Sequence, residues 1–162
     1  MVLIFITLGS QKFQFNRLLK VVDDLCERNV LDGGGVFAQI GYSDYQPEHY
    51  SFKAFLNRDE FSEEMARASI VITHGGTGAI IGAVRKGKKV IAVPRLEKYG
   101  EHVDDHQLQL IKQFDCMNLI CPCWTAEDLE KAIATVNTVS YDKYESNTQI
   151  IIAALDKFIN SI

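Results

Sequence analysis

The 162-residue chain has no apolar run long enough to span a membrane, and it has no broad basic surface. Its formal net charge is −4 at pH 7, and its one basic cluster lies within residues 85–89. Binding along a nucleic-acid backbone needs concentrated lysine and arginine, so we expect no nucleic-acid partner. The apolar residues 1–9 have neither a basic leader nor a small-residue cleavage site. We interpret them as a buried strand and not as a signal peptide.

Cysteine is scarce as well. The four cysteines are Cys26, Cys116, Cys121 and Cys123, and their spacing is that of neither a disulfide framework nor a metal site. The run Cys121-Pro122-Cys123 is one residue short of the Cys-x-x-Cys pattern of redox and zinc sites. We therefore expect free thiols and a cytoplasmic protein.

The chain does contain short apolar strands that alternate with amphipathic helices. We expect strands at residues 1–9, 36–40, 51–56, 70–73, 89–93 and 117–120. We expect helices at residues 15–25, 57–68, 79–86, 104–114, 125–136 and 147–159. This alternation is typical of βαβ units and predicts an α/β fold, a parallel sheet covered on both faces, in one domain over residues 1–162. The terminal helix is apolar enough either to pack back on the sheet or to contact a partner.

The stretch Ile70–Ile81 organises the rest of the chain. A β-branched run ends at His74, and the glycines Gly75, Gly76 and Gly78 follow before the pattern resumes at helical spacing. Glycines allow close backbone approach, and the free amides and dipole of a helix start attract an anion such as phosphate. The alternative is a glycine-rich turn that serves packing alone.

Two more polar loops follow apolar strands, at residues 9–11 and after Pro94. In a parallel sheet the ligand lies beyond the carboxyl ends of the strands, so these loops and residues 74–78 are expected to meet at one edge. The loop after Pro94 contains Glu101-His102-Val103-Asp104-Asp105-His106-Gln107. Its acidic residues suit the first turn of a helix, and its histidines and carboxylates could also suggest a metal site. Without a second ligand cluster we expect no metal and no cofactor.

Taken in order, these motifs resemble the sugar-nucleotide-binding, C-terminal domain of GT-B glycosyltransferases of family 28. The motifs are Thr-His-Gly-Gly-Thr-Gly at 73–78, Val-Pro-Arg at 93–95 and Asp-Asp-His-Gln at 104–107. The likeness covers nearly the whole chain. It extends to small stand-alone subunits, namely the catalytic half of the split N-acetylglucosaminyltransferase of N-glycan assembly and the PssE/EpsF-like proteins of exopolysaccharide and capsule synthesis. It implies a Rossmann-like, three-layer α/β/α domain with a mostly parallel sheet.

The resemblance also implies a set of contacts to a UDP-sugar donor. The first loop would approach the phosphate or sugar through Gly9, Ser10 and Gln11. The glycine turn would hold the diphosphate through His74, Gly75, Gly76, Thr77 and Gly78. The third loop would bind the sugar hydroxyls through Asp105, His106 and Gln107. The segment Phe55-Leu56, together with Met65, would flank the uracil. We expect the glycine turn to lie on a surface rim, so that His74→Ala and Thr77→Val leave the fold intact.

One position departs from the family. Many relatives have an acidic residue that binds the ribose where this chain has Gly82, so Glu101 or a partner residue would replace it. The general base is unknown, with Glu101 and His102 as candidates. The resemblance implies an inverting hexosyltransferase subunit that adds a sugar to a lipid-linked saccharide. A membrane-anchored PssD/EpsE-like partner would hold this chain at the inner face of the membrane. The alternatives are a non-catalytic enhancer subunit and a dinucleotide oxidoreductase, but the full Gly-x-Gly-x-x-Gly fingerprint of the latter is absent.

Overall fold

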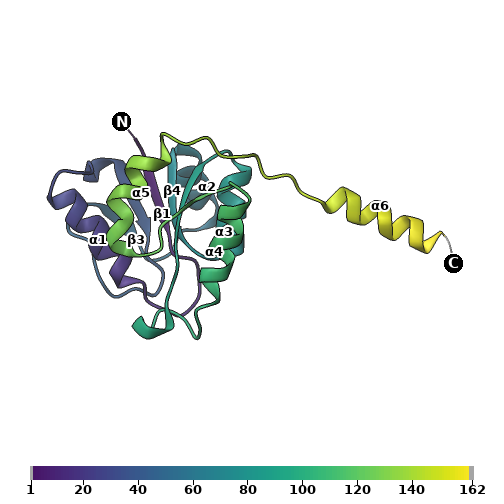
Figure 1. Cartoon of the computed structure of the whole chain (residues 1–162). Coiled ribbons are helices and arrows are strands. Elements are labelled where there is room, and N and C mark those ends of the chain that lie inside the picture. The colour runs from purple at the N-terminus through teal and green to yellow at the C-terminus, as the bar shows by residue number, and fades with distance from the viewer. Residues whose placement is uncertain (1, 161–162) are drawn as a thin grey trace.

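The computed structural model describes residues 2–160 and contains one six-stranded sheet (Figure 1). The strands are β1 (Ile4–Thr7), β2 (Val36–Gln39), β3 (Ser51–Lys53), β4 (Ile70–His74), β5 (Lys89–Val93) and β6 (Cys121–Pro122). Their order is β3-β2-β1-β4-β5-β6, and every neighbouring pair is parallel. The strand order changes direction between β1 and β4, which is the switch point where such sheets bind ligands. The predicted Rossmann-like α/β fold is confirmed.

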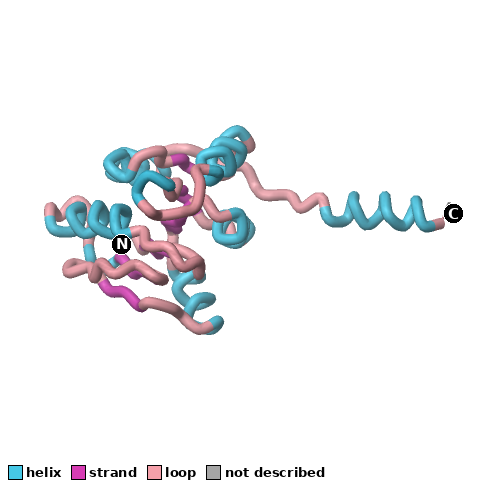
Figure 2. Tube along the Cα trace, turned by 90° about the horizontal axis from the view of Figure 1, so that it is seen from below, coloured by secondary structure: helices cyan, strands magenta, loops and turns pink. Residues whose placement is uncertain are grey.

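Helices cover both faces of this sheet, as the end-on view in Figure 2 shows. The helices are α1 (Asn16–Glu27), α2 (Arg58–Arg67), α3 (Thr77–Arg85), α4 (His106–Cys116), α5 (Leu129–Val136) and α6 (Thr148–Ile159). Three short 3₁₀ turns are η1 (Gly33–Gly35), η2 (Glu97–Tyr99) and η3 (Ala126–Asp128). Helices α1 and α5 pack in one core cluster, whereas α2, α3 and α4 pack in a second cluster.

The strands are apolar throughout because both of their faces are buried. Along β1, Ile4 and Ile6 belong to the cluster under α1 and α5, whereas Phe5 belongs to the opposite cluster. In β4, Ile72 and Val71 divide between the two faces in the same way. This burial explains the near-continuous β-branched runs, which are the pattern of a parallel sheet.

The start of α2 follows from the sequence. Asn57 accepts hydrogen bonds from the amides of Asp59 and Glu60, and the Glu60 carboxylate accepts one from the Asn57 amide, a complete capping box. The helix start expected at Thr125 differs in detail. The Thr125 hydroxyl donates to Asp128 at 2.8 Å instead of capping an amide, and a 3₁₀ turn precedes α5.

The last strand lies elsewhere than the sequence predicts. We expected residues 117–120 to form it, but the paired residues are Cys121 and Pro122 of β6. Asn118 has a left-handed backbone with φ of 54°, which turns the chain sharply after α4. Leu119 and Ile120 are buried in this turn, so their apolar character reflects the core and not a strand. Of the first strand, Met1 lies outside the described residues.

Helix α6 does not pack back on the sheet, which was one of the two arrangements expected from the sequence. It stands clear of the body at the end of an extended segment (Figure 1). Its large apolar side chains are exposed, at 73% for Ile150, 54% for Leu155 and 64% for Ile159. Of the two arrangements expected for this helix, the structure is therefore compatible with the second, in which its apolar face contacts another molecule. Among residues 2–160, no helix combines the length and apolar character needed to cross a membrane.

Candidate functional site

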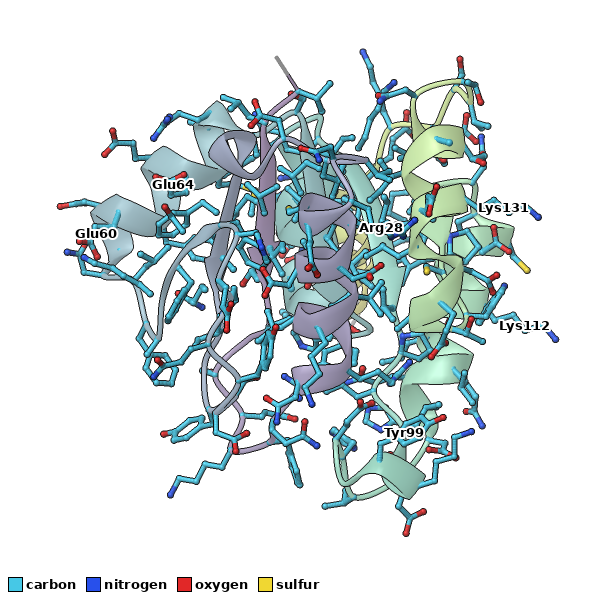
Figure 3. All side chains as sticks on the ribbon, turned by 90° about the vertical axis from the view of Figure 1, so that its left-hand side faces the viewer. Arg28, Glu60, Glu64, Tyr99, Lys112 and Lys131 are labelled. Carbon is cyan, nitrogen blue, oxygen red and sulfur yellow. The ribbon has the colours of Figure 1, made fainter. Side chains whose placement is uncertain are left out.

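Three loops meet beyond the carboxyl ends of the strands, as the sequence predicts. We call them together the rim: residues 9–11, 74–78 and 101–107. A hydrogen bond of 3.1 Å joins His102 Nε2 to Gln11 Oε1, and another of 3.0 Å joins the Gly75 amide to Gln107 Oε1. Figure 3 shows Tyr99, which precedes the third loop, at the same end of the molecule.

His74 ends β4 with its ring enclosed between two glycines. A Cβ atom on Gly9 would lie 2.8 Å from His74 Cε1, and one on Gly76 would lie 2.3 Å from His74 Nε2. Gly9 also has a left-handed backbone, with φ of 74°. Both glycines are therefore required by the ring that they enclose.

The expectation that His74 lies on the surface is wrong, because it is 9% exposed. Burial, and to a lesser extent the charge of Arg95, lowers the pKa of His74 to about 4. The ring is neutral at pH 7 and offers hydrogen bonding without positive charge. Thr77 and Gly78, in contrast, are exposed at the start of α3.

Gln107 ties two strand ends together. Its Oε1 atom accepts hydrogen bonds from the amides of Gly75 and Arg95, both at 3.0 Å. The side chain is 2% exposed, and a Cβ on Gly75 would lie 2.7 Å from its Cβ. Gln107 thus has a structural task at the rim beside the sugar-binding task that the resemblance implies.

Arg95, which the sequence motif included without a role, lies beside the rim and holds the chain around its first loop. It is 1% exposed, and its guanidinium donates to the carbonyls of Leu8, Phe13 and Gln14 at 2.6–3.1 Å. Its Nε has no hydrogen-bond partner among the described residues. Burial lowers the pKa of Arg95 to about 10, so it remains charged at pH 7. The three carbonyls come from a segment more than 80 residues away in the sequence, so no local sequence pattern could predict this role of Arg95.

Glu101, a candidate base, is fully buried and already paired. Arg17 contacts both carboxylate oxygens at 3.0 Å, and the Leu96 amide donates to Oε2 at 2.9 Å. A carboxylate held in this way supports the loop and has no free oxygen for a substrate proton or a ribose hydroxyl. His102, the other candidate, is 8% exposed, and its Nδ1 has no hydrogen-bond partner among the described residues.

The start of α3 is suited to an anion. Gly76 is the N-cap and provides no side chain, so no side-chain cap occupies the first amides of the helix. Thr77 adds an exposed hydroxyl, and a Cβ on Gly78 would have no atom within 4 Å, so the space above this turn is open. Uncapped amides and the helix dipole together favour phosphate or another anion. Gly82, one turn further on, is also exposed and faces open space.

The remaining predicted residues lie on the outer side of the rim. Ser10 and Gln11 are exposed, as are Asp105 and His106. Asp105 accepts a hydrogen bond of 2.8 Å from the amide of Glu97, which holds η2 against the third loop. His106 is bonded through Nδ1 to an oxygen of its neighbour Asp104.

Two aromatic rings lie near the ends of β2 and β3. Tyr42 and Phe55 pack edge to face with ring centroids 5.2 Å apart, and they are 49% and 46% exposed. Leu56 is tied by its amide to Gln39 at 3.0 Å. Met65, which the resemblance grouped with this segment, is 2% exposed and belongs to the core.

The comparisons with known proteins identify the family. The model of the glycosyltransferase family 28 C-terminal domain matches residues 3–162. The chain belongs to this family. Human UDP-N-acetylglucosamine transferase subunit ALG13 (Homo sapiens) is 28% identical over 134 residues, which are 74% of this chain and 11% of that protein. The chain thus spans about a ninth of the length of this curated relative.

Solved structures show the same fold. MurG of Acinetobacter baumannii has a TM-score of 0.56 at 18% identity, and the match covers 85% of this chain and 42% of that one. The spinosyn forosaminyltransferase SpnP has a TM-score of 0.53 at 15% identity, covering 84% and 35%. A family 28 C-terminal domain is therefore present, with its fold in the arrangement found in MurG.

The four cysteines are free thiols, as predicted.

Proposed function

We propose that this chain is the donor-binding, catalytic subunit of a two-component, inverting UDP-sugar glycosyltransferase. In this proposal the whole chain is one sugar-nucleotide-binding domain. The donor is a UDP-hexose carrying galactose, glucose, glucuronic acid or N-acetylglucosamine. The acceptor is a lipid-linked saccharide of exopolysaccharide or capsule synthesis. The observation that carries the proposal is the uncapped start of α3 at the switch point of the sheet, in a chain of family 28.

The diphosphate would bind at the start of α3. The amides that follow Gly76 and the hydroxyl of Thr77 are free to face it, and the backbone at Gly9 lies on the other side of the His74 ring. These groups stabilise a departing diphosphate electrostatically, so that the transfer can proceed by direct displacement without a metal ion. The neutral His74 positions this turn and adds no charge.

The nucleoside would extend toward the exposed aromatic pair Tyr42 and Phe55, where a pyrimidine ring can stack. The exposed residues Asp105 and His106 would contact the sugar hydroxyls, joined by the Nε2 group of Gln107 because its Oε1 is already engaged. With Gly82 lacking a side chain and Glu101 paired to Arg17, a partner residue would bind the ribose.

A second subunit would supply the acceptor site and the general base. The name of the human relative describes that protein as a transferase subunit. The exposed apolar face of α6, with Ile151 and Leu155, gives such a partner an area to bury. A membrane-anchored, PssD/EpsE-like partner would bring this chain to the inner face of the membrane and to a lipid-linked acceptor.

Calorimetric titration of the isolated chain with UDP tests the donor site. Thr77→Val should weaken UDP binding by roughly tenfold, the effect of removing one hydrogen bond to a charged group. Thr148→Val is the matched control, because Thr148 is also the exposed first residue of a helix. Affinity that does not change in Thr77→Val would leave the glycine turn with a packing role alone.

The non-catalytic enhancer subunit is the second candidate, and Gly82 favours it because the ribose ligand of relatives is missing. A chain that gives no saturable heat with any UDP-sugar would support this alternative.

The variant Asp105→Asn tests whether Asp105 contacts the sugar and not the nucleotide. The asparagine keeps an oxygen that can accept the hydrogen bond from the Glu97 amide, so the loop is preserved. The substitution should weaken UDP-sugar binding more than UDP binding. Full transfer by the isolated chain to a lipid-linked acceptor would refute the two-component proposal.

A further inference from the structure

Three metal-ligating side chains gather on the third loop of the rim, and of these only His106 is also assigned a donor contact in the proposed function. His102, Asp104 and His106 alternate along the chain, and their candidate ligand atoms all lie within 4.8 Å of one another. The two imidazole rings have centroids 4.7 Å apart. Zn²⁺ binds such nitrogen and carboxylate ligands at about 2.0–2.2 Å, which places two ligand atoms of a tetrahedral site about 3.3 Å apart. His102 Nδ1 lies 3.2 Å from Asp104 Oδ1.

His102 provides an independent sign of a ligand. Its side chain is 93% buried, and its Nδ1 has no hydrogen-bond partner among the residues that the structure describes. The other ring nitrogen, Nε2, donates to Gln11 Oε1 at 3.1 Å, which leaves the lone pair of the ring on Nδ1. Nδ1 lies 3.2 Å from Asp104 Oδ1 without a hydrogen bond between them. A buried polar atom without a partner is costly, and a cation between the three side chains would satisfy it. The Gln11 contact is the type that orients a metal-binding histidine.

The geometry points to a site for a divalent transition-metal ion, of which Zn²⁺ is the probe, with His102 Nδ1, Asp104 Oδ1 and His106 Nδ1 as ligands. Two imidazoles and one carboxylate favour Zn²⁺ over Mg²⁺ and Ca²⁺, which prefer oxygen ligands alone. Because these two residues are exposed, a fourth ligand can reach the ion from solvent. This inference goes beyond the proposed function and does not depend on it.

The test is calorimetric titration of the metal-free full chain with Zn²⁺, in buffer without nucleotide. We expect saturable binding of one ion per chain. His106→Gln should lower the affinity more than about 100-fold, and Gln11→Ala, which removes the partner of Nε2, roughly 10–100-fold. His106 is exposed, so its replacement leaves the core unchanged, and circular dichroism verifies this. Asp104→Asn is the second ligand variant.

Two control variants make the result specific. His49 also lies 3.2 Å from an aspartate, Asp23, but belongs to no three-ligand cluster among the residues that the structure describes, so His49→Gln should bind Zn²⁺ as the unmodified chain does. Cys116→Ser removes the exposed thiol and should also have no effect. The visible spectrum of the Co²⁺ form should lack a thiolate band. Absence of saturable binding, equal affinity in His106→Gln, or loss of binding in Cys116→Ser would each overturn the proposal. Because no nucleotide is present, failure here leaves the donor-site proposal untouched.

Discussion

Individual residues in and beside the rim use their polar groups to hold loops together. Arg95 joins the carbonyls of Leu8, Phe13 and Gln14, and Gln107 joins two strand ends through one oxygen. His74 is buried as a neutral ring between glycines. A buried titratable group such as His74 stabilises the native chain only while it keeps its protonation state, so its contribution depends on pH.

His74 should make the chain sensitive to acid. Its pKa falls from 6.5 to about 4 in the folded chain, so between these pH values the unfolded chain binds a proton that the native chain does not. Stability should therefore be complete above pH 6.5 and decline by about 3 kcal/mol as the pH falls to 4. Urea unfolding at several pH values measures this. His74→Asn should remove that part of the slope, whereas His49→Asn, which changes a half-exposed ring, should keep it. Equal slopes in all three proteins would contradict the assignment.

At the scale of elements, α3 combines two kinds of glycine. Gly76 is needed because the His74 ring leaves no space for a Cβ, whereas Gly82 faces open space in the middle of the helix. A glycine inside a helix is unfavourable because the unfolded chain has more freedom to lose. Gly82 therefore weakens α3 without any packing reason among its described neighbours.

Alanine substitutions should separate these two glycines. Gly82→Ala should raise the free energy of unfolding by about 0.5–1 kcal/mol, since it restricts the unfolded chain and meets no atom in the fold. Gly76→Ala should lower it by roughly 1–3 kcal/mol, because the new methyl group overlaps the His74 ring. Urea unfolding of both variants measures the two changes. If both variants changed the free energy of unfolding in the same direction, one explanation would be wrong. Two increases would show that the His74 ring moves aside for the new methyl group, and two decreases would show that Gly82 does not weaken α3.

For the whole molecule, the notable division is between the sheet with its covering helices and α6. The body buries its apolar residues in two clusters, and Tyr141 and Tyr144 of the connecting segment still pack against them. Beyond that point Ile150, Ile151, Ile152, Leu155 and Ile159 are exposed. An apolar surface of this kind on a separate helix is suited to association with another molecule.

Removal of residues 146–162 should leave the body equally stable. The exposed apolar residues of α6 bury little area against the body, so the free energy of unfolding should change by less than about 0.5 kcal/mol. Differential scanning calorimetry of the full and shortened chains compares them. Leu155→Ala in the full chain, which trims α6 without removing it, is the accompanying control. A shortened chain that melts several degrees lower would mean that α6 packs on the body, as its apolar stripe predicts.

The sequence by itself determined the first five strands of the sheet and the edge at which three polar loops meet. Local sequence patterns predict the apolar strands that are buried on both faces. The turn residues that follow β1, β4 and β5 likewise predict the polar loops. The capping box of α2 is likewise local, since all of its partners lie within four residues. The strands and the polar loops need no knowledge of distant contacts, which is why they were predicted, whereas the capping box of α2, although local, was not.

Tertiary structure alone decided which rim residues are free and which are occupied. Glu101 looks like a candidate base in the sequence, but Arg17, 84 residues away, occupies its oxygens. The apolar residues 117–120 were wrongly predicted to be a strand because periodicity cannot separate a buried turn from a strand. For α6 the sequence left two alternatives open because an amphipathic stripe does not specify its partner, and the structure leaves its apolar side chains exposed. His102 Nε2 is bonded to Gln11, 91 residues away, a contact that the sequence does not reveal. Burial and pairing are set by residues far apart in the chain, and only the folded structure brings those residues together.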